Sequence, residues 1–251
     1  MNEMIKKLQE RRSVREFTGE KVKDEDLKLI LETAQKYPNS VHGQQTSLIV
    51  IRDKENIRKV AELSGNQEHI KNADVFIMIL VDFYRGKYAT DSIGAANMSA
   101  ESVDGILVGA VDAGIMLSSI QTAAGALGYG TTAIGAVRSN PEKFIEMFNL
   151  PKYVYPIVGT TIGVPAKNEL KTPKPRIPLD SFAFDEKYDI EKVKEGVEIF
   201  EKEFRNWWDE NGMPERPSYK ETNSIVYGII RYNTVKSSME KQGFKFTDNE
   251  E

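Results

Sequence analysis

The sequence predicts an α+β or α/β fold class, with a sheet sandwiched between helices. Helix-like segments alternate along the chain with a few short, strongly apolar segments that have the length of buried strands. The chain has 251 residues. A chain of this length buries roughly 70–75% of its unfolded surface, so we expect one large core or two closely joined lobes.

The composition excludes several classes of protein. The absence of cysteine excludes disulfides, thiolate nucleophiles and iron–sulfur clusters. The formal net charge of −4 argues against a nucleic-acid binder, which needs a broad basic face. The longest apolar runs, 75–81 and 106–111, are far shorter than the ~20 residues of a membrane helix. No apolar region of a secretory signal follows Lys6 and Lys7. We expect a soluble, cytoplasmic protein that binds neither nucleic acid nor membrane.

Apolar spacing and turn residues predict the elements of the N-terminal half. A helix capped by Asp24 carries its apolar residues on one face and ends before Pro38. Continuous apolar runs predict buried strands at 48–51 and 75–81, with a short helix at about 56–63 between them. The intervening loops are polar and lie at 39–45 and 64–69.

The C-terminal half begins with a segment from about 102 to 127 that is rich in small and apolar residues. Its few charges predict a long helix that is buried on most sides, and Gly128-Tyr129-Gly130 ends it. Asn140-Pro141 is a good start for a helix. The remaining elements are predicted as strands at 131–137 and 154–164 and as helices at 140–148, about 190–210 and about 219–240.

Most familiar catalytic motifs are absent from the sequence. The stretch Gly128 to Ala133 matches G-x-G-x-x-A, but it follows a helix and precedes a strand, the reverse of the dinucleotide-binding context. A helix end with glycine at positive φ explains it better. The two histidines, His42 and His69, have no metal-binding spacing, and no Gly-x-Ser-x-Gly elbow is present.

Two basic clusters stand out in this acidic chain. Arg11, Arg12 and Arg15 follow a first helix suggested by the apolar residues among 4–8, and their planar donor forks suit a phosphate or an anionic ring. A solvated charge run at the end of that helix is the alternative. Lys174 and Arg176 lie between prolines that keep the backbone extended, which places both side chains on one side. With the two polar loops, these clusters would enclose one flat, anionic cofactor.

An ordered series of motifs spans nearly the whole chain and is far more specific than any one motif. Its members are Arg12-Ser13-Val14-Arg15-Glu16-Phe17, Ile30 to Ala34, Asn39-Ser40 with Gln44, Gly65-Asn66-Gln67-Glu68-His69, Leu107 to Ala113, Leu127 to Gly130, Ile134-Gly135-Ala136-Val137-Arg138 and Lys174-Pro175-Arg176-Ile177-Pro178. The series resembles the nitroreductase superfamily, and within it the NADPH-dependent flavin reductases and oxygen-insensitive nitroreductases of the major bacterial type.

The resemblance implies an α+β sandwich with a central, mainly antiparallel sheet, and an intertwined homodimer with FMN at its interface. Residues 1–180 would form the FMN-binding core, and residues 181–251 a helical extension that wraps the partner subunit. The implied FMN contacts are Arg11, Arg12, Ser13, Val14 and Arg15 at the phosphate and ring, Asn39 and Ser40 near the pyrimidine, Gln67 and His69 on the ribityl and phosphate side, the backbone of Ala133, Ile134, Gly135 and Ala136 at the isoalloxazine, and Lys174 and Arg176 at the phosphate and the N1–O2 edge.

The implied activity is hydride transfer from NAD(P)H to FMN and then two-electron transfer to a small planar acceptor such as free flavin, a quinone or a nitroaromatic, by a ping-pong mechanism. Lys174 and Arg15 would supply positive charge beside the reduced flavin. The chain departs from the family pattern at Arg11, where histidine is usual, and at Ala136, where glycine is usual. Two alternatives remain: another FMN-dependent activity of the superfamily, or a flavin-binding module without turnover.

Overall fold

The structure is a computed structural model that describes residues 2–167 and 172–247. The chain divides into two compact units. The first comprises Met1–Asn168 and Tyr232–Glu251, and the second comprises Glu169–Arg231.

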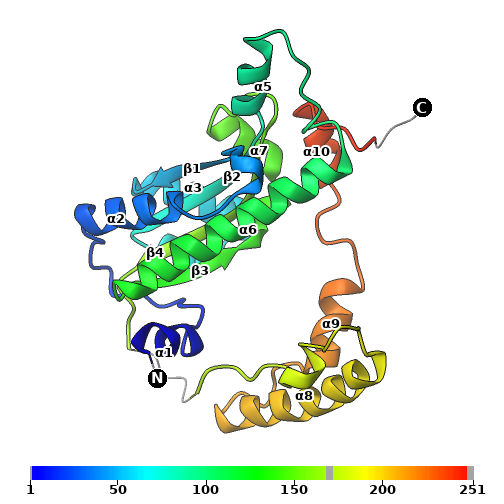
Figure 1. Cartoon of the computed structure of the whole chain (residues 1–251). Helices are drawn as coiled ribbons and strands as arrows, with labels where there is room; N and C mark the ends of the chain where they lie inside the picture. The colour runs from blue at the N-terminus through cyan, green and yellow to red at the C-terminus, as the bar shows by residue number, and fades with distance from the viewer. Residues whose placement is uncertain (1, 168–171, 248–251) are drawn as a thin grey trace. The chain divides into compact units, whose positions relative to one another are not determined.

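A four-stranded sheet forms the centre of the first unit (Figure 1). The strands are β1 (Thr46–Ile51), β2 (Val75–Asp82), β3 (Gly130–Ile134) and β4 (Val154–Gly163). Their order in the sheet is β1-β2-β4-β3, and every neighbouring pair is antiparallel. The sheet is therefore of the α+β class, and β1 and β3 are its edge strands.

Strand β2 is buried on both faces, as its continuous apolar run predicts. Val75, Ile77 and Ile79 point into one core cluster, and Phe76 and Met78 point into a second. The first cluster is covered by α2 (Asp24–Gln35), α6 (Val103–Ala126) and α10 (Val235–Lys241). The second is covered by α3 (Lys54–Leu63), α4 (Glu68–Lys71) and α7 (Pro141–Met147).

Helix α6 packs across the sheet at close range (Figure 1). A Cβ atom at Gly109 would lie 2.7 Å from a methyl group of Val81, so only glycine allows this approach. The opposite side of the helix is open: Leu107 and Val111 are 59% and 60% exposed. The prediction of a helix buried on most sides is therefore wrong for the single chain. Leu107 and Val111 belong to an exposed apolar stripe. The helix has this stripe because it is apolar on two faces, and the sheet covers only one of them.

By length and composition α6 would also be able to cross a membrane. It has this composition because it is apolar on more than one side, and the core helix of a soluble protein can have the same length and composition.

Several predicted boundaries need correction. The strand predicted at 131–137 ends at Ile134, because the chain turns into the short helix η2 (Gly135–Ser139). The helix predicted at 219–240 is two helices, α9 (Tyr219–Tyr227) and α10, with Gly228 as the C-cap of the first. Asp24 is the first residue of α2 rather than its cap, and its carboxylate bonds Arg52 instead. Helix α5 (Tyr84–Asp91) is absent from the sequence prediction because it is short, has few apolar residues and buries none of them.

The second unit consists of an extended arm, the short helix η3 (Leu179–Ser181), α8 (Ile190–Glu210) and α9. Helix α8 agrees with the predicted helix at 190–210. Helix α9 begins with a capping box between Ser218 and Glu221. The predicted division at residue 180 and the wrapping of a partner by the C-terminal extension stay predictions.

Candidate cofactor site

The arginine segment is fixed along the free edge of β3. The backbone N–H of Val14 donates to the carbonyl of Thr131 at 2.9 Å, and the hydroxyl of Thr132 donates to the carbonyl of Val14. A Cβ atom at Gly130 would lie 2.7 Å from the side chain of Val14, so this glycine makes room for the contact. The preceding helix α1 (Glu3–Gln9) brings the chain to this edge.

A second set of backbone bonds holds the chain just after the arginines. The N–H of Thr18 donates to the carbonyl of Val164, and the N–H of Ala166 donates to the carbonyl of Glu16, both at 3.0 Å. Because the segment is tied on both sides of Arg15, its backbone position is set while its side chain stays exposed.

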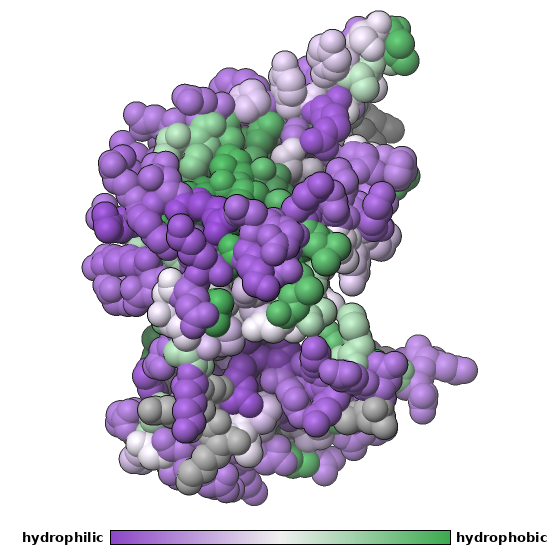
Figure 2. Space-filling view, turned by 90° about the vertical axis from the view of Figure 1, so that its left-hand side faces the viewer, coloured by the Kyte–Doolittle hydropathy of each residue, from purple (hydrophilic) through white to green (hydrophobic). Residues whose placement is uncertain are grey.

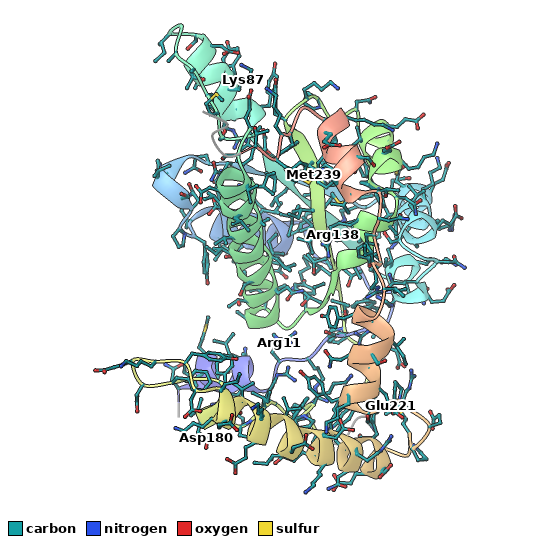
Figure 3. The ribbon with its side chains drawn as sticks, turned by 90° about the vertical axis from the view of Figure 1, so that its right-hand side faces the viewer. Arg11, Lys87, Arg138, Asp180, Glu221 and Met239 are labelled. Atoms are coloured by element: carbon teal, nitrogen blue, oxygen red, sulfur yellow. The ribbon has the colours of Figure 1, made fainter. Side chains whose placement is uncertain are left out.

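Arg11 and Arg12 line a small cavity of about 150 Å³ beside the C-terminal end of α6. Figure 3 shows Arg11 on the segment below that helix end. The walls of this cavity also include Leu8, Gln121 and Tyr129, so the two arginines line a partly apolar space.

The loop predicted at 64–69 ends at Gln67, because Glu68 and His69 begin α4, and it is fastened to the turn that follows β3. The carbonyl of Leu63 accepts hydrogen bonds from Ser139 at 3.2 Å and from the side-chain amide of Asn140 at 2.7 Å. The side-chain amide of Gln67 donates to the carbonyl of Ser64 at 2.6 Å. The predicted contacts at 67–69 and 133–136 therefore come from two segments that are tied together.

His69 and Arg15 interact electrostatically across this region. Burial is the main reason that the pKa of His69 lies below its ordinary value of 6.5, and the positive charge of Arg15 lowers it further. In residues 2–167 and 172–247, the buried Nε2 of His69 and the buried Oγ of Ser64 have no hydrogen-bond partner. Since buried polar atoms are normally satisfied, these two atoms suit a ligand that supplies the missing bonds.

Ala136 occupies a position where its methyl group has a packing role. It packs against the second core cluster, and its carbonyl accepts a 2.5 Å hydrogen bond from Ser139. Ala133, three residues earlier, is exposed. The methyl group of Ala136 is thus in use by the core, which is how the chain accommodates alanine here.

The loop at 39–45 has an unusual backbone. Val41, His42 and Gln44 all have positive φ, at 45°, 56° and 53°. Such angles are uncommon outside glycine, and most of all for a β-branched residue such as Val41, so the loop is strained. Strain of this kind persists only where neighbouring groups hold the chain in place.

Asp112 of α6 is the group that holds this loop. Its carboxylate is 4% exposed and accepts the backbone N–H of Ser40 at 3.1 Å and the side-chain amide of Gln45 at 3.1 Å. Asn39 also contributes, since its side chain accepts the N–H of Gln44 at 3.0 Å. Asp112 is not among the predicted site residues, although an acidic residue in the middle of an apolar helix is a usable signal.

Lys174 and Arg176 belong to the second unit. The Arg176 guanidinium donates to the carbonyls of Lys174 and Pro175 at 3.2 and 3.1 Å, and the Lys174 ammonium lies over aromatic rings of α8. That Lys174 and Arg176 contact the same cofactor as the residues of the first unit stays a prediction, as do the individual cofactor contacts of the other predicted site residues.

The predicted site residues of the first unit suit a planar anionic cofactor. They supply exposed guanidinium groups, an imidazole and a hydroxyl without partners, and two loops fixed by hydrogen bonds. Within the described ranges, no group of three His, Asp or Glu side chains is arranged to hold a metal ion. Such a set binds and orients a ligand, and it leaves the reactive chemistry to that ligand.

Comparison with known proteins identifies the relatives of the chain. The model of the nitroreductase family matches residues 8–164, and that of the nitroreductase family C-terminal domain matches residues 174–247. The chain is 38% identical over 249 residues to the FMN reductase [NAD(P)H] of Bacillus subtilis, covering 98% of this chain and 99% of that protein. It is 32% identical to the Cr(VI) reductase of a Pseudomonas species, covering 97% and 100%.

A solved structure gives the same result for the fold. The hypothetical oxidoreductase YcnD from Bacillus subtilis superimposes with a TM-score of 0.95 at 36% identity, covering 99% of this chain and 100% of that one.

The first prediction concerns the charge state of His69 in the ligand-free protein. With only two histidines in the chain, an NMR titration will resolve it. We expect a pKa below 6.5, and a rise toward that value in Arg15→Gln because one of its two causes is removed. At a pH between the pKa values of His69 in the folded and the unfolded chain, the unfolded chain binds more protons. Protonation therefore favours unfolding, and the stability contributed by neutral His69 is lost as pH falls below about 6.5. A pKa at or above 6.5 contradicts the assignment.

The second prediction concerns Asp112. The variant Asp112→Asn removes the charge that Ser40 and Gln45 share, and hydrogen bonds to charged groups contribute about 1.5–3 kcal/mol. Amide hydrogen exchange at Ser40 should accelerate roughly tenfold to a hundredfold. The control is Asp104→Asn, which changes an exposed carboxylate in the first turn of the same helix. Equal exchange at Ser40 in both variants would show that Asp112 does not hold the loop.

Proposed function

The chain belongs to the nitroreductase family, and from this membership we propose that it is an FMN-dependent oxidoreductase. It takes a hydride from NAD(P)H and passes two electrons to a small planar acceptor, either free flavin, a quinone or a nitroaromatic, by a ping-pong mechanism. The observation that carries the proposal is the exposed Arg15 beside His69, whose buried Nε2 has no partner in the described chain. The name of the Bacillus subtilis relative, FMN reductase [NAD(P)H], supports the same cofactor and donor.

FMN, when bound, supplies the hydride acceptor and donor. The chain holds the cofactor by its phosphate and ring. Arg11, Arg12 and Arg15 supply charge-assisted hydrogen bonds from the edge of β3. His69 is neutral at neutral pH, so one ring nitrogen donates and the other accepts without adding charge.

Asn39 and Ser40 bind near the pyrimidine from the strained loop, and the backbone of residues 133–136 lies along the ring system. Lys174 and Arg176 complete the phosphate and N1–O2 contacts. These assignments rest on the resemblance, and the hydrogen bonds of Asp112 support the fixed position of the loop.

Catalysis in this proposal depends on charge rather than on a nucleophile. Arg15 and Lys174 would hold positive charge at the N1–O2 edge of the bound cofactor, where a cation placed beforehand favours its reduced form. The absence of cysteine agrees with a site that needs alignment more than a covalent step.

NADPH as donor requires a cation for its 2′-phosphate. In the second unit Arg205 and Arg216 line one open cavity, and Arg231 is a third candidate by charge. Arg205 is already tied to the carbonyl of Arg216 at 2.6 Å and to Asp209 at 3.3 Å. We favour Arg216, which is exposed and whose guanidinium lies 5.8 Å from the ring centroid of Trp208, a contact that does not use its N–H donors.

We also propose a cytoplasmic homodimer. The exposed stripe of α6, with Val103, Leu107 and Val111, is the kind of surface that a second copy covers. Figure 2 shows a face of the molecule on which hydrophobic side chains gather within a hydrophilic surround.

The third prediction tests turnover. NADPH added without air should bleach the visible absorbance of the bound flavin, and menadione should restore it. Initial rates at several menadione concentrations should give parallel double-reciprocal lines, the pattern of a ping-pong mechanism. Flavin that stays oxidised in NADPH and in NADH would favour the binding module. Rapid bleaching without reoxidation by any of the three acceptor classes would favour another activity of the superfamily.

The fourth prediction concerns affinity for FMN. Arg12→Ala and Arg176→Ala each remove a charge-assisted contact of about 1.5–3 kcal/mol, so the Kd for FMN should rise roughly tenfold to a hundredfold. Flavin fluorescence during titration of the flavin-free protein measures it. Lys59→Ala, on the exposed part of α3, is the control and should bind FMN as the wild type does. Wild-type affinity in both arginine variants would remove these residues from the site.

A further inference from the structure

The arm that carries Lys174 is docked on α8 at two places. The indole N–H of Trp207, which is 5% exposed, donates to the hydroxyl of Thr172 at 2.9 Å and to its carbonyl at 3.2 Å. Farther along, Gly196 admits Ser181, since a Cβ atom at this glycine would lie 2.1 Å from the hydroxyl of Ser181. Figure 3 shows Asp180 beside α8 at this second place. The stretch between the two docking points is therefore held along the helix.

The ammonium group of Lys174 lies among three aromatic rings of α8. Its distance to the ring centroid is 4.6 Å for Trp208, 5.6 Å for Trp207 and 5.5 Å for Phe204. The rings also pack on one another, with the two indoles 4.8 Å apart and edge to face. A cation within about 6 Å of a ring centroid is attracted by the ring face, most strongly by tryptophan.

We propose that Trp208, with Trp207 and Phe204, is a positioning residue that acts through Lys174 and holds its charge ready for the flavin. The inference rests on the proposed function, in which Lys174 contacts the cofactor. A free lysine side chain loses rotamer freedom when it is fixed at a site. The three rings restrict that freedom before FMN binds. The entropy of fixing the cation is therefore lost when the protein folds, and less is lost when FMN binds.

Trp208 is the ring to change. Trp207 also anchors the arm through Thr172, whereas the indole N–H of Trp208 has no partner among the residues the structure describes. Trp208→Phe therefore keeps an aromatic face and removes no hydrogen bond. Trp208→Leu removes the face from Lys174 and also from Arg216, whose guanidinium lies 5.8 Å from the ring centroid, so the cycle with Lys174→Met is needed to isolate the effect through Lys174. The matched control is Phe200→Leu, about two turns before Trp208 on α8, where the ring packs against Phe204 and Tyr219.

The test is a double-mutant cycle on FMN affinity and on the flavin reduction potential. Trp208→Leu should weaken FMN binding roughly two- to fivefold, the effect of one exposed cation–π contact, and make the potential more negative. Trp208→Phe should restore most of both. In a Lys174→Met background, Trp208→Leu should change neither, because the cation through which Trp208 acts is gone. Phe200→Leu should leave the potential unchanged in either background.

Equal effects of Trp208→Leu with and without Lys174 would show a merely structural role and overturn the inference. If Lys174→Met binds FMN with unchanged affinity and potential, the inference also fails. The proposed function still stands in that case, provided that NADPH bleaches the flavin.

A measurement without flavin covers the case in which the leucine variant folds poorly. After reductive ¹³C-methylation, the Lys174 methyl signal, assigned by its loss in Lys174→Met, should show an upfield ring-current shift in the wild type and in Trp208→Phe. An unshifted signal would show that the Lys174 ammonium does not lie among the three rings, and it would overturn the inference.

Discussion

The pairing of the arginine segment with the edge of β3 is the contact on which the candidate site depends. Val14 bonds Thr131 and Thr132, and Gly130 leaves the space for its side chain. An edge strand has unpaired backbone groups that need partners, and the segment supplies them. In return, the position of Arg15 beside His69 is set by main-chain hydrogen bonds rather than by a flexible loop.

The rest of the first unit keeps that edge rigid. Strand β2 is buried on both faces, so helices cover both sides of the sheet. Helix α6 packs on one face through Gly109 and holds the strained loop at 39–45 through Asp112. Helix α6 therefore has three roles. One face packs in the core, and the buried carboxylate of Asp112 holds the loop that carries a predicted cofactor contact. The other face exposes an apolar stripe. We read that stripe as the surface of a homodimer, which joins subunit association to the integrity of the site.

The sequence predicted the fold well where burial alone decides structure. The apolar run at 75–81 became the central strand, and the small, apolar segment at 102–127 became α6. The motif series correctly indicated the family. Prediction failed at η2, where a tertiary contact decides, since Ser139 bonds back to the turn and to Leu63. It also failed at α9, which ends at its C-cap Gly228 although apolar spacing continues.

The candidate site shows the same division. Arg15 and His69 were predicted as cofactor contacts, which stays a prediction, and the structure adds that they interact with each other electrostatically. Asp112 was not predicted, because its role depends on a loop that is 67 residues or more away in sequence. The aromatic surroundings of Lys174 were likewise out of reach, since Trp207 and Trp208 follow it by a whole helix. Local pattern reveals residue types and segments, but it does not reveal which distant side chain fixes them.

The visible absorbance spectrum of the freshly purified protein, followed by release and quantification of any flavin, tests the central claim most directly. We predict a yellow protein with the bands of oxidised flavin and about one FMN per chain. A colourless protein that takes up no FMN at micromolar concentration would contradict the account.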